Sequence, residues 1–364
     1  MATQVAQEQE LDLAKAQAFA FKVMGDTTSV LMGPLHLAGE RLGLFNVLAD
    51  GGPATSDVFA LRAGIDARYA REWLAAMACF GYVRYDDLSK EFSLTPEQAF
   101  VLVNRDSPAY LGSMVHLLLD YWKNVDLLTD VIRSGGGVPQ DHFGAEWSCG
   151  FERFSRTAFL NNLCQDWIPS MPEVDRRLRA GGTAADIGCG NGQALIELAK
   201  GYPEARLVGY DYHAPAIETA RANAEAAGVA DRVRFEVCDV VKGIPGSYDL
   251  ITCFDVVHDM PRPVESMRAI RESLTPGGSF FVLEFNLSGD LQENIDHPFG
   301  MGAFGYAASV NYCLTTALAA GGVGTGTCMG ERTFRRYAAE AGFGDVRRHD
   351  FAHNPLNLFY EVRA

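Results

Sequence analysis

The chain has 364 residues, of which 48% are hydrophobic and 21% charged, and its formal net charge is −15. This length predicts two domains, each able to bury a core of its own. A surface this acidic repels phosphate backbones and anionic membranes, which argues against nucleic acid and membranes as partners. The eight cysteines include no C-x-x-C pair, a pattern typical of reduced thiols rather than a zinc motif.

The N-terminal stretch "MATQVAQEQELDLAKAQ" has neither the basic start nor the apolar segment of a secretion signal. No run of about 18 apolar residues occurs, so no transmembrane helix is predicted. We therefore expect a cytoplasmic protein.

The first hundred residues predict helices followed by a hairpin. Residues 11–51 show apolar positions at helical spacing and end in Gly-Gly, and "TSDVFALRAG" reads as a short helix. An amphipathic helix follows from Asp66 to near Gly81, and "YVRYDDLSKEFSLT" alternates around a polar turn as a hairpin does. This order predicts a winged-helix domain, which we assign to residues 1–104.

Residues 105–175 are predicted to be helical and are rich in aromatic residues, so we interpret them as a linker or a lid over a substrate. Four of their side chains are candidates for an acceptor pocket: Tyr121, His142, Phe143 and Trp147. Packing between domains explains the aromatic members equally well, and a surface position is the simpler explanation for His142.

The rest of the chain, residues 176–364, alternates short apolar runs with helical stretches. This alternation predicts an α/β domain with a parallel sheet covered by helices on both faces. A glycine-rich segment, residues 287–330, interrupts the pattern as an insertion.

The stretch "AADIGCGNG" places Asp186, Gly188, Gly190 and Gly192 across a strand-to-helix turn. Glycines allow a sharp turn and close approach of a ligand beside a helix N-terminus. Asp186 precedes the first glycine, where its carboxylate can receive a cationic amino group. Dinucleotide fingerprints instead combine G-x-G-x-x-G with an acid about 20 residues later.

Acidic residues also end the next strands. Asp211 and Tyr212 follow the second strand, and Asp239 and Val240 follow the third, where carboxylates can bind ribose hydroxyls and an adenine edge. Ligands of α/β sheets bind at the carboxyl ends of strands, which favours one site built from these residues.

These motifs resemble those of the class I S-adenosylmethionine-dependent methyltransferases. "ADIGCGNG" is similar to their first motif, "GYDYH" and "EVCDV" to their ribose- and adenine-binding strand ends, and "SLTPGGSFFVLEF" to their fifth strand. The resemblance implies S-adenosylmethionine as cofactor and a Rossmann-like domain with a mainly parallel seven-stranded sheet. The cofactor-binding residues it implies are Asp186, Gly188, Gly190, Gly192, Asp211, Tyr212, Asp239, Val240, Phe254 and Asp255.

The N-terminal domain is similar to the dimerisation module of small-molecule O-methyltransferases, and its "RYAREWLAAMA" stretch looks closest to a bacterial branch often labelled as regulators. The resemblance implies a homodimer. A transcriptional regulator that senses the cofactor is the alternative. Its recognition helix would carry Arg68 and Arg71 but also Asp66, Glu72 and a long apolar run, which suits a partner subunit better than DNA.

In plant-type O-methyltransferases a His-Asp pair after the fourth strand supplies the base, flanked by two acids. "VVHDM" matches the pair at His258 and Asp259, and Glu284 and Glu331 match the acids. This implies methylation of an oxygen on a small molecule, with His258 as base. Met260 and the insertion depart from the family pattern. The alternatives are S-methylation of a thioether acid such as a methylthio-hydroxybutyrate, with His258 only binding it, or a structural histidine.

His297, in the insertion, is a further candidate for binding substrate. The spacing of His258, Asp259 and His297 fits no metal-ligand motif, and we expect no bound metal.

Overall fold

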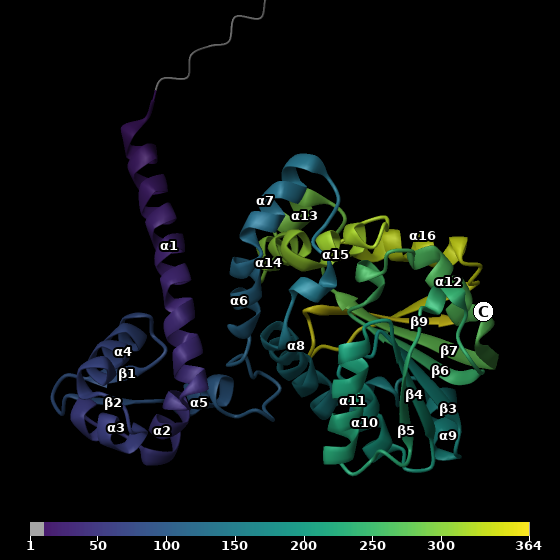
Figure 1. Ribbon diagram of the computed structural model, residues 1–364, viewed down its shortest axis with the longest axis horizontal. Helices are drawn as coiled ribbons and strands as arrows, with labels where there is room; N and C mark the ends of the chain where they lie inside the picture. Colours follow the sequence, from purple (N-terminus) through teal and green to yellow (C-terminus); the bar gives the residue numbers. More distant parts are fainter. Residues whose placement is uncertain (1–10, 364) are drawn as a thin grey trace, which may run out of the picture. The chain divides into compact units, whose positions relative to one another are not determined.

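The computed structural model describes residues 11–363, which fall into two compact units (Figure 1). The first unit contains the residues up to Arg105 together with Ala109–Val115, and the second contains Asp106–Pro108 and the residues from His116 onward. The first ten residues, on which the expectation of no secretion signal partly depends, lie outside the described range.

The first unit is a helical domain with a small hairpin. Its core surrounds Trp73, whose indole nitrogen donates to the Leu35 carbonyl at 2.9 Å. Its elements are α1 (Leu13–Arg41), α2 (Leu44–Gly51), α3 (Ser56–Ala63), α4 (Ala67–Cys79), β1 (Arg84–Asp86), β2 (Glu91–Ser93) and α5 (Pro96–Leu102). The antiparallel pair β1–β2 after the helices confirms the predicted winged-helix architecture.

The predicted helical region 11–51 contains two helices, α1 and α2. Gly43, between α1 and α2, has a φ of 65°, a left-handed conformation that L side chains rarely adopt. Asp66 begins α4 as its N-cap, where its carboxylate accepts the amides of Arg68 and Tyr69.

The second unit contains the seven-stranded sheet that the resemblance implied. The strand order is β5-β4-β3-β6-β7-β9-β8, and only β9 runs antiparallel to its neighbours β7 and β8. The strands are β3 (Thr183–Ile187), β4 (Arg206–Asp211), β5 (Val233–Val237), β6 (Tyr248–Phe254), β7 (Leu274–Phe285), β8 (Asp345–His349) and β9 (Asn357–Arg363). Because the first five are parallel, their carboxyl ends lie along one edge.

Helices cover both faces of this sheet (Figure 1). Adjacent strand residues enter opposite cores: Ala184 packs into one and Ala185 into the other. The first core includes α9 (Pro172–Arg179), α10 (Gln193–Gly201) and α11 (Ala214–Ala226), and the second includes α12 (Pro263–Glu272) and α16 (Gly330–Glu340).

Two further helical segments each contain a π-helical stretch, and parts of both lie together at one end of the sheet (Figure 1). One segment comprises α6 (His116–Lys123), α7 (Val125–Ser134), the 3-10 turn Gln140–His142, α8 (Ala145–Ala158) and the π-helix Phe159–Trp167. The other comprises α13 (Leu291–Ile295), α14 (Met301–Ala308), the π-helix Ser309–Cys313 and α15 (Leu314–Ala319). Within residues 11–363, no helix has the length and apolar character needed to cross a membrane.

Candidate active site

Asp186 lies at the end of β3 with 3% of its surface exposed. Burial raises the pKa of this carboxyl to about 7, although a hydrogen bond from the Thr252 hydroxyl, at 2.7 Å, opposes the shift. A cationic group beside Asp186 would remove the cost of burying its charge.

The turn after Asp186 requires glycine for two reasons. Gly188 has a φ of +68°, and a Cβ there would lie 2.5 Å from a methyl group of Val256. Gly192 has a φ of +82°, and a Cβ would lie 2.6 Å from the Phe235 ring. The amide of Gly190 donates to Asp211 at 3.0 Å, which fixes the turn to the end of β4.

The other predicted cofactor residues on β4 and β5 also lie at strand ends. Asp211 accepts the His213 amide at 2.9 Å, and burial raises the pKa of its carboxyl despite its two amide hydrogen bonds. Tyr212 is 55% exposed, and its hydroxyl bonds Gln140. Asp239 caps the 3-10 turn Val240–Lys242 and pairs with Lys242 at 3.2 Å, and Val240 is half-buried.

Two residues at the end of β6 differ sharply in their surroundings. Phe254 packs into the core against Phe159, Trp167 and Phe281. Asp255 has a φ of 56°, and its buried Oδ1 has no hydrogen-bond partner within residues 11–363. Strained residues that are polar and buried are concentrated at functional sites, which draws attention to Asp255.

His258 follows β6 in the 3-10 turn Val257–Asp259 and is 1% exposed. Its Nδ1 lies 2.5 Å from Glu284 Oε2, and its Nε2 lies 3.2 Å from Asp259 Oδ1. The other oxygen of Glu284 accepts the Val257 amide at 2.9 Å, so this carboxylate is held by backbone and side chain together. The structure thus brings three of the four predicted catalytic residues together.

Burial acts to lower the pKa of His258, but the Glu284 and Asp259 carboxylates outweigh it and hold that pKa well above the ordinary histidine value. Burial likewise raises the pKa of Asp259, against the influence of the imidazole. The pair His258–Asp259 is therefore able to keep a proton between its two members.

Glu331, the fourth predicted catalytic residue, lies at the start of α16, where it pairs with arginines rather than with His258. It forms ion pairs with Arg335 at 2.7 Å and with Arg348 at 3.0 Å. Burial acts to raise the pKa of Glu331, but these two arginines lower it overall. The ion pair between Arg348 and Glu331 could not be predicted from the sequence, because β8 lies beside α16 only in the folded chain.

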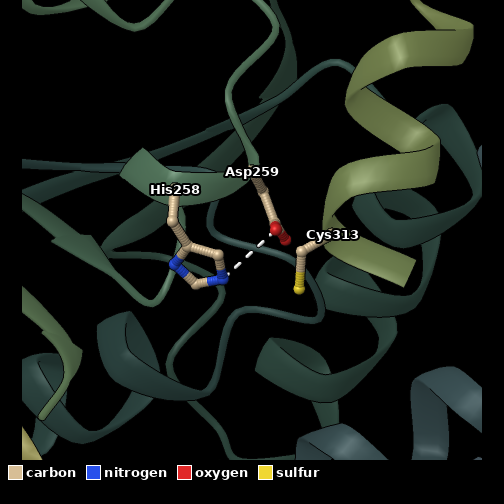
Figure 2. A group of neighbouring side chains, drawn as sticks. All are labelled: His258, Asp259 and Cys313. Atoms are coloured by element: carbon tan, nitrogen blue, oxygen red, sulfur yellow. Dashed lines mark ion pairs between the residues drawn. The ribbon is translucent and has the colours of Figure 1, made fainter. Parts of the chain in front are cut away.

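Cys313 occupies a place beside His258 that sequence reasoning assigned to no residue. It ends the π-helix Ser309–Cys313, and its sulfur, the Asp259 carboxylate and a His258 nitrogen all lie within 4.8 Å of one another (Figure 2). Burial raises the pKa of this thiol to about 12. Nitrogen, oxygen and sulfur donors in such proximity are able to hold a metal ion.

His297 and His142 do not join this group. His297 Nε2 lies 3.0 Å from the Asn286 carbonyl, and its Nδ1 accepts the Phe299 amide at 3.3 Å, so both ring nitrogens contact local backbone. His142 is exposed. The metal triad considered from the sequence, which included His297, is thus not assembled.

The predicted aromatic residues do gather, around a tyrosine from the insertion. Trp147 stacks on Tyr312 at 3.8 Å between ring centroids, and Phe143 meets the same ring edge-on at 4.8 Å. Tyr121 packs against this cluster, which also includes Cys313, and burial raises the pKa of Tyr121 to about 12. An apolar wall therefore adjoins the group at His258.

Glu152 on α8 is a further residue that the sequence did not reveal. Its carboxylate accepts hydrogen bonds from Asn191 at 2.6 Å and Gln193 at 2.8 Å. Both donors belong to the glycine turn and the start of α10. Glu152 thus fixes the turn to the same helix that carries Trp147.

Comparison with known proteins agrees with this geometry. Residues 178–335 match the family described as a methyltransferase domain, and residues 32–104 match an Rv2258c-like winged HTH domain. A ubiquinone biosynthesis O-methyltransferase of Pseudomonas paraeruginosa is 29% identical over 128 residues, which cover 35% of this chain and 52% of that protein. The chain spans about half or less of the length of the curated relatives it matches.

Solved structures match over almost the whole chain. Mitomycin 7-O-methyltransferase has a TM-score of 0.67 at 18% identity and covers 96% of this chain and 100% of its own. Human N-acetylserotonin methyltransferase in complex with S-adenosylmethionine has a TM-score of 0.67 at 17% identity, covering 100% and 99%. At these identities the likeness establishes a shared fold. Residues 178–335 of the chain therefore match a methyltransferase domain, preceded by a match to an Rv2258c-like winged helix-turn-helix domain over residues 32–104.

Proposed function

We propose that the protein transfers a methyl group from S-adenosylmethionine to an oxygen of a small molecule, with His258 as the base. The observation that carries this is the clamp on His258, in which Glu284 holds Nδ1 at 2.5 Å and directs Nε2 toward Asp259 and Cys313. A base oriented by a carboxylate on its far nitrogen is the arrangement that proton abstraction from a hydroxyl requires.

The residues at the strand ends support cofactor binding. Asp186 would pair with the ammonium group, and Asp211 and Asp239 would face the ribose and adenine. S-adenosylmethionine supplies a methyl group already activated on a sulfonium. The protein's remaining tasks are to align the acceptor, to exclude water and to remove one proton.

The proton has a defined route in this proposal. Nε2 first passes its proton to Asp259, at 3.2 Å, which leaves a neutral imidazole. Nε2 then accepts the acceptor's hydroxyl proton while the oxygen bonds to the methyl carbon and the carbon–sulfur bond breaks. Trp147, Phe143 and Tyr121 would line the apolar part of the acceptor.

The test is a panel of phenols, alcohols and thioether acids incubated with protein and S-adenosylmethionine, with mass spectrometry to find a methylated product. Wild type should methylate a hydroxyl compound, and His258→Gln should bind S-adenosylmethionine but turn over far more slowly. Full turnover of a thioether acid by His258→Gln would instead favour S-methylation without a base.

We also propose that the first unit forms a homodimer through α1. This helix exposes a series of large apolar side chains, among them Phe19 and Leu31, each 66% exposed. Exposed apolar surface of this extent favours a protein partner, and a second copy fits the implied dimerisation role.

Light scattering should show a dimer for wild type and a monomer when Phe19 and Leu31 are changed to Glu. The control is Leu88→Glu, at a hairpin position 95% exposed, which should leave the dimer intact. A monomeric wild type that shifts random duplex DNA in a salt-dependent way would point to a regulator.

A further inference from the structure

Three different kinds of metal-ligand atom lie close together beside the apolar cluster of Tyr121, Phe143, Trp147 and Tyr312. His258 offers Nε2, Asp259 a carboxylate oxygen and Cys313 its sulfur, all within 4.8 Å of one another (Figure 2). Tetrahedral zinc with bonds of about 2.0–2.3 Å needs ligand atoms roughly 3.3–3.7 Å apart. The 3.2 Å between Nε2 and Asp259 Oδ1 is within about 0.1 Å of this range, and the Cys313 sulfur lies within 4.8 Å of the nitrogen and of a carboxylate oxygen.

The surroundings of His258 match those of a metal ligand. A histidine that binds metal through one nitrogen usually donates its other ring N–H to a carboxylate, which fixes the ring. Glu284 Oε2 lies 2.5 Å from His258 Nδ1, where it accepts such an N–H, and Glu284 also accepts the Val257 amide. Nε2 is thereby left facing the other two donors.

The carboxyl groups around His258 are a further source of ligand atoms. Asp255, Asp259 and Glu284 lie around this single imidazole. The buried Oδ1 of Asp255 has no hydrogen-bond partner within the described residues, and that of Asp259 lies 3.2 Å from His258 Nε2. Buried carboxylates are normally paired or bound to metal.

We propose that His258, Asp259 and Cys313 bind one zinc ion or a similar divalent ion of borderline softness. The bound ion takes the Nε2 lone pair that the base needs, so it inhibits methyl transfer in competition with the acceptor. The Cys313 thiol proton and the proton shared by His258 and Asp259 both leave to solvent on binding, and no electron transfer occurs. Metal binding is independent of the proposed function, and only the inhibition depends on it.

The test uses the full chain after treatment with a chelator. Zn²⁺ is titrated by calorimetry, and Co²⁺ is added in parallel to detect the near-ultraviolet absorption of a cobalt–thiolate bond. Wild type should bind one ion with this absorption. Cys313→Ser should lose the absorption and bind Zn²⁺ at least about tenfold more weakly, and Glu284→Gln should weaken Zn²⁺ binding by about 10–100-fold.

The matched control is Cys164→Ser. Cys164 is another partly buried thiol whose pKa burial raises to about 12, but its sulfur contacts the Glu197 carbonyl, away from His258. This variant should bind both ions as wild type does. Circular dichroism and S-adenosylmethionine binding establish that Cys313→Ser is folded.

Equal Zn²⁺ affinity in wild type and Cys313→Ser, or Co²⁺ binding without thiolate absorption, would overturn the site. Tight Zn²⁺ binding that leaves turnover unchanged would overturn the proposal that the ion occupies the His258 nitrogen needed for proton abstraction. Zn²⁺ binding by a protein that methylates no acceptor would count against the proposed function only.

Discussion

Two regions of the second unit are organised by different interactions: the strand edge at Asp186, Asp211 and Asp239, proposed to bind the cofactor and here called the cofactor edge, and the group around His258 and Trp147, proposed to bind the acceptor and here called the acceptor end. At the cofactor edge, carboxylates of Asp211 and Asp239 bond backbone amides, and the turn is shaped by glycine geometry. At the acceptor end, side chains contact side chains, as in the pair His258–Glu284 and the stack Trp147–Tyr312. Changes at the first should therefore alter cofactor binding and stability, and changes at the second should alter turnover.

The largest expected effect is on turnover at the acceptor end. His258→Gln should lower kcat by about 10²–10⁴-fold, because the base is lost while the turn Val257–Asp259 keeps its shape. The dissociation constant of S-adenosylmethionine, measured by calorimetry, should stay within about twofold of wild type. A large loss of cofactor affinity in His258→Gln would contradict the claim that the acceptor end affects turnover and not cofactor binding.

At the cofactor edge, Gly188→Ala should destabilise the fold by roughly 2–4 kcal/mol, since left-handed backbone strain and the clash with Val256 add together. Thermal unfolding measures this loss. Gly228→Ala is the matched control, with the same φ of +68° but no atom within 4 Å of the added Cβ. It should cost about 1–2 kcal/mol. Equal losses would show that strain alone matters.

The pH dependence of cofactor affinity should report on Asp186. Its pKa of about 7 lies above the unfolded value of 3.8, so the free protein holds a proton there that the unfolded chain releases. The contribution of this carboxyl to stability is therefore present below pH 4 and is lost as pH rises toward 7.

S-adenosylmethionine binding should follow the opposite trend, because only the ionised carboxylate pairs with an ammonium group. Affinity should fall by up to about tenfold for each pH unit below 7 and level off above it. Calorimetry from pH 5.5 to 7.5 should show this slope in wild type, and the slope should be absent in Asp186→Asn.

The smallest expected effect lies where the two regions are joined. Glu152→Gln removes one acceptor for Asn191 or Gln193 and should weaken S-adenosylmethionine binding about fivefold, equivalent to about 1 kcal/mol. Glu225→Gln, at an exposed position on α11, should leave the affinity unchanged. An unchanged affinity in Glu152→Gln would mean that the glycine turn holds its own shape.

The features that could be predicted from the sequence lie mainly at the cofactor edge, and those that could not lie mainly at the acceptor end. The strand-end positions of Asp186, Asp211 and Asp239 were predictable because strand, turn and helix signals are local, and the seven-stranded sheet was implied by the family resemblance. Cys313 was not, because it reaches His258 across 55 residues through the fold of the insertion. Spacing along the chain carries no information about such an approach.

Glu331 is a residue that the sequence predicted to join His258 but that the structure pairs with other side chains. The sequence of Glu331 and its neighbours matches a family position, but in the structure its carboxylate forms ion pairs with Arg335 and Arg348. Glu284 reaches His258 because it lies on β7, directly beside β6 in the sheet. Sheet neighbours are set by topology, whereas loop and helix-end partners depend on the packing of each chain.

The π-helical stretch Ser309–Cys313 gives the insertion a property of evolutionary interest. A π-helical turn is one residue longer than an α-helical turn, and each residue of an α-helix advances by about 100° around its axis. Deleting Asn311 would regularise α14 through α15 and rotate Cys313 away from His258, without rebuilding the sheet. A deletion of one codon would thus change which side chain lies beside His258.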